Sequence, residues 1–195
     1  SLPVRTGKAR VIGIEPASLV TKSLVREVKT DDAGCFQSAL NPGLTKIAVI
    51  ERHKRTGKLG IGILEGYGLT GGAIATTISH DSHNIVVAGD NDPDMLLAVR
   101  ELADMGGGIV SVHGGAIRRL SLPIAGLMTS ADPQEVNAVL HDMLVAARAE
   151  LGIPEDVEPF MTLSFMALPV IPELKLTARG LFNVNTFSFV GVEAD

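Results

Sequence analysis

Five consecutive polar residues between two short apolar segments place the strongest constraint on how this chain folds. Residues 74–78 and residues 85–88 each have the pattern of a β-strand. The residues between them are His80, Asp81, Ser82, His83 and Asn84. An ordinary turn favours Gly, Pro or a single Asn instead. Two imidazoles, a carboxylate, a hydroxyl and an amide are costly to bury unless the fold uses them, so any account of function has to explain this segment first.

The composition favours one domain over residues 1–195, in which 46% of the residues are apolar and can form a core. The net charge of −5, without a basic run, argues against nucleic acid as a partner. The single cysteine, Cys35, excludes an internal disulfide and a cysteine-based zinc site. No apolar run reaches the roughly 18 residues that cross a bilayer. We therefore expect a cytoplasmic domain without a membrane partner.

Apolar periodicity predicts a mixed α/β fold with a largely antiparallel or mixed sheet. We expect strands at residues 9–15, 19–28, 46–51, 59–64, 74–78, 85–88, 109–112, 116–122 and 187–192. One helix is predicted from an N-cap at Asp92 to the glycines at 106–108, and a second from Asp132 to Gly152. Two helices on one side of the sheet fit this pattern. Residues 159–181 are apolar but interrupted by prolines, and no element is assigned to them.

Residues 80–84 allow three interpretations. His and Asp are good ligands for a first-row metal ion, but His80 and His83 would point to opposite faces of a strand and converge only if the chain turns between them. The second interpretation is acid–base work or hydrogen bonding to a substrate at the end of a strand. The third is a polar turn that satisfies its own backbone. The residues alone leave all three open.

Two carboxylates outside this segment are further candidates. Glu65 precedes a glycine-rich connector, where it either projects into a cleft or is solvated. Glu173 stands in the apolar residues 159–181, and Lys175 or Arg179 is the candidate partner that would neutralise it. Residues 51–53 fit an exposed strand end better than a site. No serine lies in a nucleophile elbow, and no glycine-rich motif fits a phosphate.

Seven segments also match a known pattern, in order along most of the chain. They are residues 46–57, 66–69, 72–76, 79–85, 91–95, 122–128 and 159–177. Together they resemble the C-terminal domain of the microbial adenine deaminases of the amidohydrolase superfamily. The resemblance implies hydrolytic deamination of adenine to hypoxanthine and ammonia in purine salvage.

The resemblance also implies a divalent metal site, usually with manganese or iron and alternatively zinc, on a (β/α)₈ barrel that carries a His-x-His pair. This sequence has no His-x-His, and 195 residues are too few for that barrel and this domain together. We therefore expect the C-terminal domain without the catalytic barrel. We expect no metal ligand or cofactor in this chain and no activity from it alone.

Within the resemblance, one group of residues is expected on the catalytic or substrate side, namely His80, Asp81 and His83. A second group is expected to bind substrate, namely Ser82, Asn84, Glu65 and Glu173. The expected partners are adenine or a related purine, the catalytic barrel of the same enzyme, and further copies of the chain. The alternatives are a structural or oligomerisation module, and a stand-alone purine-binding domain without catalysis.

Overall fold

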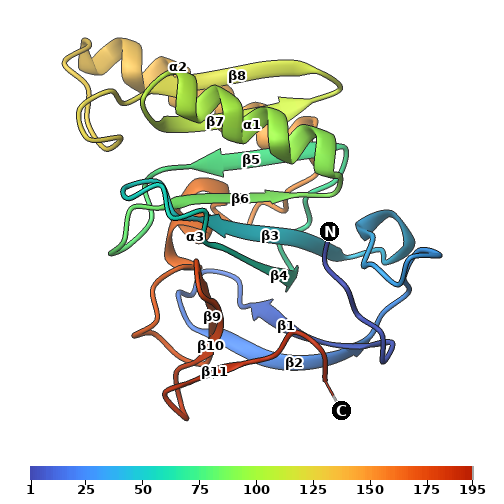
Figure 1. Cartoon of the computed structure of the whole chain (residues 1–195). Coiled ribbons are helices and arrows are strands. Elements are labelled where there is room, and N and C mark those ends of the chain that lie inside the picture. Colours follow the sequence, from blue (N-terminus) through green and yellow to red (C-terminus); the bar gives the residue numbers. More distant parts are fainter. Residues whose placement is uncertain (195) are drawn as a thin grey trace.

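One large open sheet organises the molecule, as shown by the computed structural model, which describes residues 1–194 (Figure 1). Its strand order is β2-β1-β4-β3-β6-β5-β7-β8. The strands are β1 (Lys8–Ile14), β2 (Thr21–Glu27), β3 (Leu44–Ile50), β4 (Leu59–Glu65), β5 (Gly72–Thr76), β6 (Ile85–Gly89), β7 (Gly108–His113) and β8 (Ala116–Ser121). Neighbours are antiparallel except β1 and β4, which are parallel. The predicted mixed sheet is confirmed.

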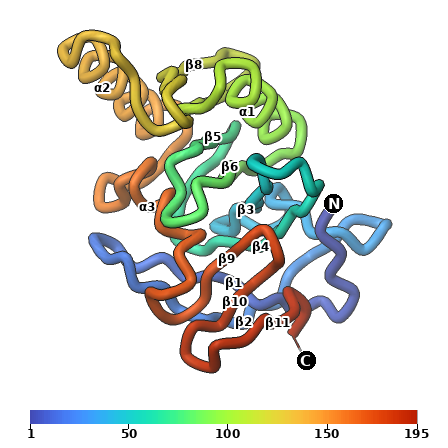
Figure 2. Tube along the Cα trace, turned by 60° about the vertical axis from the view of Figure 1, so that its left-hand side comes forward, coloured from blue at the N-terminus to red at the C-terminus, as the bar shows by residue number. Residues whose placement is uncertain are grey.

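Helices cover both faces of this sheet. They are α1 (Asp92–Asp104), α2 (Pro133–Ala149) and α3 (Pro159–Phe165), and a short 3₁₀ helix spans Ser38–Leu40. Ala73 and Ala75 of β5 face α1, whereas Ile74 between them faces α2 and α3. Figure 2 shows α1 and α3 on opposite sides of β5 and β6. The expectation that both main helices share one side is therefore wrong, because the central strands are apolar on both faces.

The N-caps of the two longer helices differ in how well the sequence predicts them. Asp132 caps α2 as predicted, since its carboxylate accepts the Gln134 N–H at 2.8 Å. The cap of α1 is Asn91, which accepts the Asp94 N–H at 2.9 Å, and the prediction of Asp92 was one residue late. Asp92 lies in the first turn and pairs with Lys46 instead. No helix within residues 1–194 is long and apolar enough to cross a membrane.

A second, three-stranded antiparallel sheet packs beside β4. It consists of β9 (Leu174–Thr177), β10 (Gly180–Asn183) and β11 (Ser188–Val190). Helix α3, strand β9 and the start of β10 lie in residues 159–181, where the sequence predicted no element. Glu158 starts α3 by accepting the Met161 N–H, and Pro159 occupies the first helical position. The predicted closing strand at residues 187–192 is the shorter β11.

Three loops meet at one end of the large sheet, on the left in Figure 1. They are residues 51–58 between β3 and β4, residues 77–84 between β5 and β6, and residues 122–131 after β8. The antiparallel register brings them together, because Ile50 at the end of β3 pairs with Ile85 at the start of β6. This end of the sheet holds the candidate site.

Candidate functional site

Residues 79–84, named the polar loop below, turn the chain sharply between β5 and β6. The His83 N–H donates to the Ser79 carbonyl oxygen at 2.6 Å, and His83 takes a left-handed backbone with φ of 46°. The turn brings the rings of His80 and His83 together, with their centroids 6.0 Å apart. Two side chains that a straight strand would separate therefore lie close to each other.

His80 borders an apolar groove of about 440 Å³ between the sheet, α2 and α3. Its ring packs against Phe165 at the end of α3, with centroids 4.6 Å apart. Two other polar side chains of the groove already have hydrogen-bond partners within the protein. The Glu158 carboxylate caps α3, and the Ser164 hydroxyl donates to the Met161 carbonyl. None of the residues 1–194 hydrogen-bonds to the His80 ring, so its nitrogens can meet a ligand.

Arg52 and His53 form the other half of this site, although their sequence context fits an exposed strand end better than a site. The Arg52 Nε donates to the His83 carbonyl oxygen at 2.6 Å, and its main-chain N–H faces the Asn84 amide oxygen at 3.4 Å. The His53 Nε2 lies 2.8 Å from the Ser82 carbonyl oxygen. The buried Asn84 and the carbonyl of Ser82 thus tie the polar loop to Arg52 and His53.

Burial and neighbouring positive charge act together on the imidazole of His83. Its burial, followed by the charges of His80 and Arg52, lowers the pKa of His83 below 6.5, although the Asp81 carboxylate opposes this. His83 is therefore mainly neutral at pH 7. Its Nδ1 is buried without a partner among the described residues, as is the Ser79 hydroxyl. Asp81 and Ser82 are exposed.

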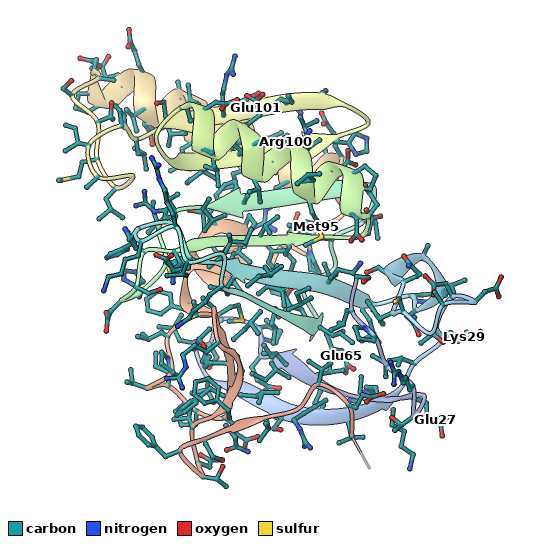
Figure 3. The ribbon with its side chains drawn as sticks, in the orientation of Figure 1. Glu27, Lys29, Glu65, Met95, Arg100 and Glu101 are labelled. Carbon is teal, nitrogen blue, oxygen red and sulfur yellow. The ribbon has the colours of Figure 1, made fainter. Side chains whose placement is uncertain are left out.

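The structure places Glu65 and Glu173 away from the polar loop. Glu65 ends β4 at the opposite end of the sheet, on the side of the molecule where Glu27 and Lys29 also lie (Figure 3), and forms a two-bond ion pair with Arg26 at 2.6 and 2.9 Å. It borders a separate cleft of about 650 Å³. Glu173 accepts the Ser23 N–H of β2 at 2.9 Å.

The expected neutralisation of Glu173 by a nearby cation is absent from the described part of the chain. Lys175 donates to the Leu19 carbonyl oxygen at 2.9 Å, and the Arg179 guanidinium lies over the Phe189 ring at 4.6 Å. The carboxylate of Glu173 is instead satisfied by a main-chain N–H. The two acidic candidates therefore have structural partners and do not join the histidines.

The fold and this loop define a class of protein, a mixed α/β domain that offers hydrogen-bonding side chains at one end of its sheet. Within residues 1–194 no three His, Cys, Asp or Glu side chains gather into a group that could hold a metal ion. The family model of the adenine deaminase C-terminal domain matches residues 18–188, and the chain belongs to this family.

Curated relatives agree with this assignment. The chain is 60% identical over 98% of its length to the adenine deaminase of Nitratidesulfovibrio vulgaris strain Hildenborough. It is 45% identical over 97% of its length to that of Clostridium acetobutylicum, and 44% identical over its whole length to that of Listeria monocytogenes serotype 4b. The chain covers only 33%, 33% and 34% of these relatives. The predicted family is confirmed.

Proposed function

We propose that this chain is the C-terminal part of an adenine deaminase and that its polar loop contributes to a wall or lid of the active site. The observation that carries the proposal is the family match over nearly the whole chain, combined with coverage of a third of each relative. In this proposal the other two thirds provide the barrel with its manganese or iron. Within residues 1–194 no group of side chains could hold that metal, and in this proposal the chain alone is inactive.

The chemistry of the polar loop suits a role beside a purine. Adenine offers ring nitrogens and an exocyclic amine, which neutral imidazoles and carboxylates can bind as donors and acceptors. His80 has both ring nitrogens available beside an apolar groove, and the exposed Asp81 lies next to it in the chain. A neutral His83 has a ring lone pair that can accept a proton near pH 7. In this proposal the enzyme acts in the cytoplasm as a homo-oligomer.

Alanine substitutions in the full-length enzyme test this role. We expect His80→Ala and His83→Ala each to lower kcat/KM at least about tenfold, because general acid–base groups contribute about a hundredfold or more. Melting temperatures should stay within a few degrees of the parent. His141→Ala is the matched control, since His141 is exposed on α2. Near-normal turnover in both loop variants would remove the proposed role.

A second candidate is a module for assembly. Phe187 is 78% exposed and Phe189 is 43% exposed, and both rings pack against Phe182, so they form a contiguous apolar surface of the kind that meets another protein. If assembly is the function, Phe187→Ser lowers the oligomer mass in light scattering, whereas the histidine variants keep their turnover. The two candidates therefore give opposite results in the same pair of measurements.

A further inference from the structure

We propose that Arg52 is a positioning residue, which fixes the polar loop in the arrangement that presents His80 and His83. The inference rests on the proposed function, because it concerns the same loop. The inference adds Arg52, which follows the end of β3 and contacts the backbone of the polar loop between β5 and β6.

The Arg52 guanidinium joins two loops through their backbones. Its Nε donates to the His83 carbonyl oxygen and its Nη2 donates to the Ala125 carbonyl oxygen, both at 2.6 Å. Ala125 belongs to the loop of residues 122–131, which follows β8. One side chain therefore ties the polar loop to a segment more than 40 residues further along the chain. Hydrogen bonds from a charged donor are about twice as strong as neutral ones.

The surroundings of Arg52 favour this role over that of an ordinary surface cation. None of the ion pairs formed within residues 1–194 includes Arg52. Burial lowers its pKa, so its charge is partly desolvated while its hydrogen bonds go to carbonyl groups. A Cβ atom at Gly126 would lie 2.6 Å from the Arg52 Nη2, so a glycine is needed for the guanidinium to approach.

The strained backbone of the loop explains why it requires such a partner. His83 has positive φ, which costs energy for a residue with a side chain. Its carbonyl loses a charged donor when Arg52 is removed, and the loop can then relax. Because a misplacement of about 1 Å can lower a rate about a hundredfold, we expect kcat to follow the order of the loop.

Three variants in the full-length enzyme test the inference. Arg52→Gln removes both charge-assisted bonds, and Arg52→Lys keeps the charge but cannot reproduce the two-bond fork. Gly126→Ala keeps Arg52 and displaces its guanidinium. Arg55→Gln is the matched control, because it removes the same charge from the same turn at an exposed position. The measurements are kcat, KM and hydrogen exchange of the amides in residues 79–84.

We expect kcat to fall and hydrogen exchange in the polar loop to speed up together, by amounts that differ among the variants. Arg52→Gln and Gly126→Ala should lower kcat about tenfold or more and speed exchange in residues 79–84 about tenfold. The kcat and the exchange rate of Arg52→Lys should fall between those of these two variants and those of the parent. Arg55→Gln should match the parent in both. Unchanged exchange in Arg52→Gln, or faster exchange with unchanged kcat, overturns the inference.

The proposed function and this inference fail in different ways. If the histidine variants lose turnover while Arg52→Gln keeps it, only the positioning role is wrong. If the histidine variants also keep their turnover, the proposed function fails and the positioning role fails with it.

Discussion

At the scale of single residues, Lys175 is the most unusual ionisable group outside the candidate site. Its side chain is 0% exposed, and its ammonium meets the Leu19 carbonyl oxygen but no carboxylate within the described residues. Burial lowers the pKa of Lys175 to about 8, compared with 10.5 for a solvated lysine. The folded protein therefore releases this proton more easily than the unfolded chain does.

The depressed pKa of Lys175 predicts how stability changes with pH. Between about pH 8 and pH 10 the unfolded chain keeps the proton that the folded chain has lost, so the free energy of unfolding rises with pH. Urea denaturation should show a gain of about 2 kcal/mol from about pH 7.5 to about pH 9.5. Lys175→Met should lack this gain, whereas Lys58→Met at an exposed position should retain it. An equal gain in Lys175→Met would contradict the prediction.

The site could be predicted from the sequence only in part. Residues 80–84 stand out because five polar residues between two strands are unusual. Arg52 does not stand out, since its contacts with His83 and Asn84 span 31 and 32 residues and depend on the pairing of β3 with β6. Glu65 and Glu173 are candidates because of the residues beside them in the sequence. Their hydrogen-bond partners, Arg26 and Ser23, lie on β2, which is far away in the sequence.

At the scale of elements, the two sheets meet at a glycine. Gly60 of β4 lies under the hairpin of β9 and β10, where a Cβ atom would be 2.0 Å from the Thr177 carbonyl oxygen. A side chain at this position would force the backbones of β4 and of the hairpin apart. The glycines at alternate positions of β4 therefore allow the second sheet to approach. This contact is needed for the position of residues 174–183 beside the large sheet.

Gly60→Ala should therefore lower the free energy of unfolding by about 3 kcal/mol or more, since overpacking against backbone cannot relax as a side chain does. Gly191→Ala is the control, because its Cβ would have no neighbour closer than 3.6 Å, and it should change stability by less than about 1 kcal/mol. Chemical denaturation of both variants gives the comparison. Similar losses in the two would show that the approach of the sheets does not depend on Gly60.

The helices and strands were predictable where the spacing of apolar residues was clear. Alternating strands and the capped helix α2 were located from residues alone, whereas α3 has only seven residues and begins and ends among prolines. Helix placement required more than periodicity. Because β5 and β6 are buried at every position and have no exposed polar face, their sequences do not show which face each helix covers.

At the scale of the whole molecule, the proposed function divides the work between this chain and the rest of the enzyme. It has an open sheet with a polar loop at one end and, among residues 1–194, no metal-binding group of side chains. Its relatives are about three times as long and are called adenine deaminases. In the proposed function, the rest of the enzyme supplies the reaction centre beside which this loop lies.

This division predicts the behaviour of the chain by itself. With adenine and added Mn²⁺, we expect no ammonia release above the uncatalysed rate, because metal-assisted hydrolysis needs a bound metal that activates water. The full-length enzyme under the same conditions is the positive control, and circular dichroism checks that the chain is folded. Calorimetric titration with adenine then separates the remaining roles, since heat without turnover indicates a purine-binding domain. Ammonia release by the folded chain would show that it holds a reaction centre of its own.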